Sequence, residues 1–153
     1  MHFLVVLLLV ATANPYNYLV YSPVVAHSHD NYLGKLADVL TDAGHCVTYL
    51  APLVNYRLKG KIGVKRTKDI ITSEPDDALI NIQNKIEGTD VGNFWTEFAG
   101  LFTQDEMIKS FLFMYNHHCE LISMNDTMKG ELKSRKFDVM IFEGFNNCAY
   151  CTP

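Results

Sequence analysis

The sequence has no excess of basic residues and, after residue 13, no long apolar run. Its 13 Lys and Arg stand against 17 Asp and Glu, which gives a net charge of −4. A mildly acidic chain has no strong electrostatic reason to bind nucleic acid or anionic lipid, so neither is expected as a partner. A membrane-spanning helix needs about 20 apolar residues, and no later segment approaches that length. Internal repeats and low-complexity segments are also lacking.

The composition is that of an ordinary globular protein. Of the 153 residues, 48% are hydrophobic and 20% are charged, which excludes a wholly disordered chain. This length suits one domain, or one half of a two-lobed protein.

The N-terminal segment differs from the rest of the chain. Phe3–Ala11 is an unbroken apolar run, and Ala11–Ala13 has the small-x-small pattern that signal peptidase reads. We therefore predict a signal peptide over residues 1–13, and a mature chain over residues 14–153 in the lumen of the endoplasmic reticulum. Little positive charge precedes the apolar run, so a buried N-terminal strand stays open as the alternative.

The cysteines of the chain are Cys46, Cys119, Cys148 and Cys151. In the secretory pathway they are able to form disulfides, and the sequence does not choose among their three pairings. Cys148–Cys151 is also a C-x-x-C motif, an alternative redox site, but no helix is predicted after it to lower a thiol pKa. His27 and His29, with His117–Cys119, suggest zinc as a further alternative. That set lacks a defined third ligand, and we expect no metal.

The start of the mature chain predicts a strand, a helix and a second strand. Residues 18–21 are apolar and aromatic and stop at Ser22–Pro23, as a strand does before a turn. A loop over Val24–Ser28 is expected to follow. The next segment has the apolar spacing of one helical face, carried by Leu33, Leu36, Ala37 and Leu40. Cys46–Leu50 then predicts a second strand, which makes a βαβ unit with parallel neighbouring strands.

The remainder of the chain continues the alternation. A short strand is predicted around Ile70–Ile71, and a helix from Pro75 to Ile86. Apolar residues from Phe94 to Ile122 have helical spacing, and Glu131–Lys136 reads as a charged helical end. Phe137–Phe142 is a largely apolar strand of the kind buried in a parallel sheet. The fold class is therefore α/β, with a Rossmann-like, doubly wound parallel sheet.

Two ionisable residues follow predicted strands. In open parallel sheets, ligands bind beyond the carboxyl ends of the strands. His29 comes after the first strand, and Glu143 comes directly after the last. A histidine beside a carboxylate is able to act as a general base. The alternative at this point is a histidine at a helix end and a glutamate that is merely solvated.

Several segments together resemble a known family. Ser28–Gly34 (SHDNYLG), Leu40–Thr48 (LTDAGHCVT) and Lys136–Phe145 (KFDVMIFEGF) resemble the N-terminal half of UDP-glycosyltransferases of the glucuronosyltransferase family. Further segments are especially similar to nematode members, namely Tyr18–Pro23, His27–His29, Thr67–Asp69 and Cys148–Tyr150. Each motif is short, and their order and spacing together carry the resemblance.

The resemblance implies the N-terminal lobe of a GT-B glycosyltransferase, which transfers a sugar from a UDP-sugar to a hydroxyl of a small lipophilic acceptor, with inversion. By position in the family, His29 is implied to be the general base and Glu143 its acidic partner, where many members have Asp. The acceptor is implied to bind an aromatic stretch comprising Phe94, Trp95, Phe98, Phe111 and Tyr115. Plain core packing of these residues is the alternative. The UDP-sugar is a substrate, and no cofactor is expected.

The family's donor-binding motif, which is rich in Trp, Pro, Gln, His and Gly, is not found in the sequence. We therefore expect an acceptor-binding lobe in a truncated form, inactive alone, with membrane-anchored full-length relatives. A non-catalytic ligand-binding or regulatory module that pairs with such relatives is the alternative, and homo- or hetero-oligomers fit either reading. Asn125–Thr127 is the sole N-x-[ST] sequence, so Asn125 is the expected glycan acceptor.

Overall fold

The computed structural model describes residues 15–87, 101–144 and 148–149, so the predicted signal peptide lies outside the described residues. The elements, in chain order, are β1 (Asn17–Tyr21), α2 (His27–Asp42), β2 (Cys46–Leu50), η1 (Tyr56–Leu58), β3 (Asp69–Ile71), α3 (Asp77–Glu87), α4 (Leu101–Met124), α5 (Asp126–Ser134) and β4 (Val139–Phe142).

The four described strands form one parallel sheet in the order β3-β2-β1-β4. The predicted βαβ unit is confirmed, since α2 connects β1 to its parallel neighbour β2. From β1 the chain builds outward through β2 to β3, and it then returns to place β4 on the other side of β1. The direction of winding therefore reverses between β1 and β4. Such a switch point is where open α/β sheets leave a crevice for ligands.

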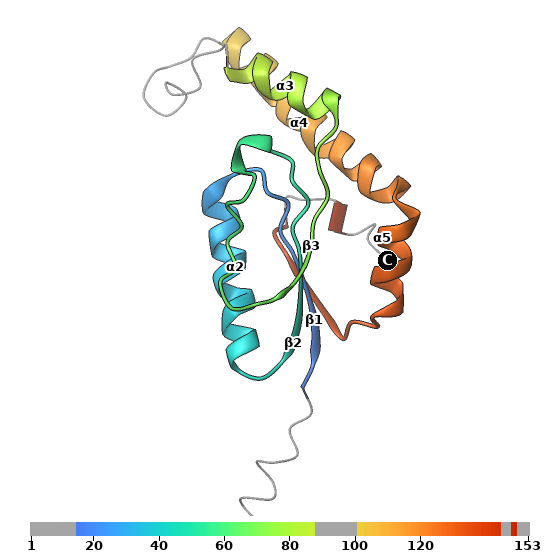
Figure 1. Cartoon of the computed structure of the whole chain (residues 1–153). Helices are drawn as coiled ribbons and strands as arrows, with labels where there is room; N and C mark the ends of the chain where they lie inside the picture. The colour runs from blue at the N-terminus through green and yellow to red at the C-terminus, as the bar shows by residue number, and fades with distance from the viewer. Residues whose placement is uncertain (1–14, 88–100, 145–147, 150–153) are drawn as a thin grey trace, which may run out of the picture.

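Helices cover both faces of the sheet (Figure 1). On one face, Val20 and Tyr49 pack with Leu33 and Ala37 of α2. The opposite face packs against α4 and α5 through a second cluster, which includes Leu19, Tyr21, Leu50, Ile122, Met128 and Leu132. Neighbouring residues of a strand point to opposite faces, so the central strands β1 and β2 are buried from both sides. The apolar strand β4 was expected to be buried in the same way, but it is an outer strand of the described sheet and none of its residues is fully buried. The fold is the predicted α/β, Rossmann-like arrangement.

Two predicted boundaries were wrong. Helix α2 begins at His27, inside the loop predicted over Val24–Ser28, because Ala26 already takes the extended conformation of an N-cap. The charged stretch Glu131–Lys136 was predicted as a helical end, and α5 does end within it, at Ser134, two residues earlier than predicted. The earlier start keeps His29 in the first turn of the helix, as predicted.

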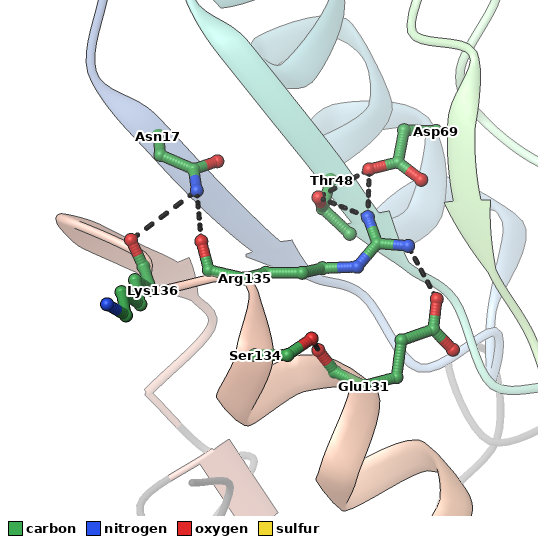
Figure 2. Close-up of polar contacts among 7 residues, drawn as sticks. All are labelled: Asn17, Thr48, Asp69, Glu131, Ser134, Arg135 and Lys136. Atoms are coloured by element: carbon green, nitrogen blue, oxygen red, sulfur yellow. Dashed lines mark hydrogen bonds and ion pairs between the residues drawn. The ribbon is translucent and has the colours of Figure 1, made fainter.

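The amino ends of the strands are joined through Arg135, which follows α5 (Figure 2). Its guanidinium donates to Thr48 Oγ1 at 3.1 Å, to the Asp69 carboxylate and to Glu131. The side-chain amide of Asn17 donates to the Arg135 carbonyl at 2.7 Å. These contacts join the segment before β4 to β1, β2 and β3 near the amino ends of the strands. The switch point lies at the opposite, carboxyl ends.

Candidate active site at the switch point

His29 and Glu143 meet beyond the carboxyl ends of β1 and β4. His29 lies in the first turn of α2, and Glu143 directly follows β4. Because β1 and β4 pair in parallel, with Tyr21 opposite Phe142, the residues that follow them emerge at the same edge. His29 Nδ1 lies 2.8 Å and 3.0 Å from the two carboxylate oxygens of Glu143. The sequence predicted the place of each residue, and the structure adds their contact.

The contact decides which nitrogen of the imidazole carries the proton. A carboxylate oxygen accepts hydrogen bonds, so Nδ1 is the N–H donor to Glu143. In that tautomer the basic lone pair is on Nε2. The side chain of His29 is 46% exposed and that of Glu143 is 22% exposed, so a small molecule from solvent is able to reach the imidazole.

A small pocket surrounds this pair. Its other lining residues are Ser22, Pro23, Val25, Leu33 and Tyr115. Tyr115 comes from α4, so the segment after β1, helices α2 and α4, and the segment after β4 all contribute. Burial, together with the negative charge of Glu143, raises the pKa of the Tyr115 phenol above its ordinary value. The phenol therefore stays protonated at neutral pH.

An apolar cavity of about 220 Å³ adjoins the pocket. Its lining includes Val25, Val54, Gln83, Phe111 and Met114. Val25 lines both spaces, and Phe111 lies one turn before Tyr115 on α4. Together they make one face that changes from apolar to ionisable. The arrangement suits a molecule with an apolar body and one polar end.

Comparisons with known proteins identify relatives of this chain. The chain is 32% identical over 142 residues to ugt-47 of Caenorhabditis elegans, which carries the name of a UDP-glucuronosyltransferase. It is 31% identical over 144 residues to ugt-47 of Caenorhabditis briggsae, and 25% identical over 133 residues to ugt-56 of C. elegans, both named in the same way. These alignments cover 88%, 94% and 87% of this chain, respectively. The chain is related to the UDP-glucuronosyltransferases.

The similarity covers most of this chain but only part of each relative. This chain spans about a quarter of the length of the curated relatives that it matches. No family model and no solved structure matches it. The resemblance read from the short motifs is thus confirmed by alignment over nearly the whole chain.

The other predicted site residues divide into two groups. Phe111 and Tyr115 line the apolar cavity and the small pocket, respectively. The remaining aromatic residues lie outside the described residues, namely Phe94, Trp95 and Phe98. Ser22 and Val25 were missed by sequence reasoning, because a Ser-Pro turn and a valine carry no signal that separates a pocket wall from an ordinary strand end.

The described part of the chain gives little support to a C-x-x-C redox site or to a zinc site. Cys119 forms a disulfide with Cys148, Cys46 is a free and exposed thiol, and Cys151 is not described. Within residues 15–87, 101–144 and 148–149, no group of three or more His, Cys, Asp or Glu side chains is arranged to hold a metal. Among the same residues, no helix combines the length and apolarity needed to cross a membrane.

Proposed function

We propose that the chain supplies the acceptor-binding and proton-accepting part of an inverting UDP-sugar-dependent glycosyltransferase. The observation that carries the proposal is the contact of His29 Nδ1 with the Glu143 carboxylate at the switch point, beside an apolar cavity. The kinship with UDP-glucuronosyltransferases supports it.

In this mechanism His29 is the general base. Its Nε2 takes the proton from the acceptor hydroxyl as the oxygen attacks the anomeric carbon of the sugar. The new carbon–oxygen bond forms as the bond to UDP breaks, and UDP leaves with the electron pair. Attack opposite the leaving group inverts the configuration. Glu143 holds the tautomer that makes Nε2 basic, and it stabilises the imidazolium that forms.

The acceptor's apolar body would lie against Phe111, Met114 and Val25, with its hydroxyl directed to His29. The phenol of Tyr115 lines the same pocket and would donate a hydrogen bond to the acceptor oxygen. Phe94, Trp95 and Phe98 remain proposed acceptor contacts on the resemblance alone.

The proposal includes routing through the secretory pathway by residues 1–13, with Asn125 as the glycan acceptor. The Cys119–Cys148 disulfide supports it, because such bonds persist in oxidising compartments. Asn125 is partly exposed and caps α5, where its Oδ1 accepts from the Met128 N–H at 3.0 Å. Its side-chain nitrogen, to which a glycan would be joined, does not make that bond.

The test compares the 153-residue chain with a fusion to the C-terminal lobe of ugt-47, using UDP release with a phenolic acceptor. We expect turnover from the fusion alone, because stabilising the leaving group is often the largest catalytic term and the sequence lacks the donor-binding motif. Turnover by the chain alone would contradict the division into two lobes. Acceptor binding by a folded fusion without turnover would favour a ligand-binding module.

A further inference from the structure

Asp30, the residue after His29, has a carboxylate that the proposed chemistry does not use. It is 0% exposed. Its Oδ1 accepts hydrogen bonds from the Tyr49 hydroxyl at 2.7 Å and from Ser22 Oγ at 3.2 Å. Tyr49 belongs to β2, and Ser22 follows β1 and lines the pocket around His29. One buried oxygen therefore joins the first turn of α2 to both central strands.

The same turn is covered from outside by the loop before β3. A Cβ placed on Gly63 would lie 2.2 Å from the Asp30 carbonyl oxygen, and one on Gly34 would lie 2.4 Å from the backbone of Gly63. Only backbone fits between helix and loop at this point. The Tyr49 hydroxyl also donates to the Asp30 carbonyl at 3.0 Å, so the backbone and side chain of Asp30 are both held.

Burying the Asp30 carboxylate destabilises the fold, so its presence needs a reason other than stability. Asp30 Oδ2 is buried with no hydrogen-bond partner among the described residues. A buried polar oxygen without a partner destabilises the fold, and an apolar side chain would avoid that cost. Burial raises the pKa of Tyr49 far above its ordinary value, so its hydroxyl remains a donor throughout the physiological range.

The first turn of α2 lacks the restraint that a helix usually has. Its N-cap residue is Ala26, which has no side chain able to accept from the turn's N–H groups, and no side-chain cap bond is present. Successive residues of a helix point about 100° apart. A small rotation of this uncapped first turn would therefore move the His29 imidazole away from Glu143.

We propose that Asp30 is a positioning residue for His29, and that its bonds to Ser22 and Tyr49 restrain the uncapped first turn and hold the imidazole against Glu143. This inference rests on the proposed function for its catalytic meaning. Its structural content, the orientation of one imidazole, stands apart from any transfer of sugar.

The test is ¹⁵N NMR of the His29 imidazole in the full chain, with Asp30→Ala compared against Asp38→Ala. Asp38 lies two turns later on α2, and its carboxylate accepts from the backbone N–H groups of Lys65, Arg66 and Thr67 at 2.8–2.9 Å. Both changes remove anchoring bonds from the same helix. We expect Asp30→Ala to lose the Nδ1–H form, as a Glu143→Ala reference does, and Asp38→Ala to keep it.

Two milder variants complete the design. Asp30→Asn retains the Oδ1 acceptor and should restore the wild-type imidazole signals, and Tyr49→Phe repeats the loss test with a smaller change if Asp30→Ala unfolds. Wild-type His29 signals in both folded loss variants would overturn the proposal. In an active fusion, Asp30→Ala should lower kcat roughly 10–100-fold with little change in KM. An inactive wild-type fusion would count against the proposed function and leave the NMR result standing.

Discussion

Two adjacent histidines of α4 have opposite electrostatic surroundings. His118 is 2% exposed, and its Nε2 forms a 2.9 Å hydrogen bond with the Tyr21 hydroxyl. Burial lowers the pKa of His118 to about 4, and the charge of His117 adds to the effect. His117 instead contacts the Asp76 carboxylate at 2.7 Å. That hydrogen bond raises the pKa of His117 above its ordinary value, against an opposing effect of burial.

His118 makes the protein sensitive to mild acid. When folding lowers the pKa of a histidine, its contribution to the free energy of unfolding is fully present above the pKa of the unfolded chain. The folded protein loses that contribution as pH falls, because the unfolded chain binds the proton first. Between pH 6.5 and about 4 the loss from this group is about 3 kcal/mol. Urea unfolding across this range should show the loss, and His118→Phe should flatten it.

His117→Gln is the matched control for that measurement. Its folded pKa is raised, so its contribution is present below the unfolded pKa and is lost as pH rises. Removing it takes away a stabilising contribution that grows as pH falls, and its charge is the smaller cause of the lowered His118 pKa, so most of the acid loss should remain. An unchanged acid slope in a folded His118→Phe variant would contradict the assignment.

For individual residues, the sequence predicted their place in the fold better than the side chains they contact. His29 and Glu143 were predicted because residues that follow parallel strands share an edge, and their contact could not be predicted because it depends on which strands are neighbours. No site role for Asp30 was predicted from the sequence. Its burial depends on Tyr49 and on the approach of Gly63, which a one-dimensional pattern does not contain.

Among the elements, α2 and the loop before β3 are in unusually close contact. A Cβ on Gly63 would meet the backbone of Asp30 and Asn31 at 2.2–3.0 Å, so the loop or the helix must move. We expect Gly63→Ala to destabilise the fold by about 1–3 kcal/mol, the usual cost of overpacking. Thermal unfolding would measure it.

Gly130 provides the matched control. It lies within α5, and a Cβ there would meet nothing within 4 Å. Gly130→Ala should stabilise the protein by about 0.4–1 kcal/mol, because alanine favours a helix and restricts the unfolded chain. Equal effects of the two substitutions would contradict the close packing of Gly63.

For the molecule as a whole, the order and type of the four described strands and of α2, α3 and α4 were predicted, because alternating apolar patterns of different period leave few arrangements other than α/β. The short helix η1 and the separation of α5 from α4 were not predicted. Helix boundaries were less predictable. The sequence gives no side-chain cap at Ala26, so nothing marked the start of α2 at His27. The disulfide partner of Cys119 also depended on the fold, since Cys148 lies 29 residues further along the chain.

In the proposed mechanism His29 accepts the proton of the acceptor hydroxyl, and a comparison of two histidine variants tests this claim. In the fusion with a donor lobe, His29→Ala should lower kcat by about 10²–10⁴-fold, the usual worth of a positioned general base. His27→Ala is the control, because His27 is an exposed histidine of the same helical turn that does not line the pocket. Turnover by the fusion that carries His27→Ala should stay near that of the unmodified fusion. Full activity in His29→Ala, or an equal loss in both variants, would contradict the claim.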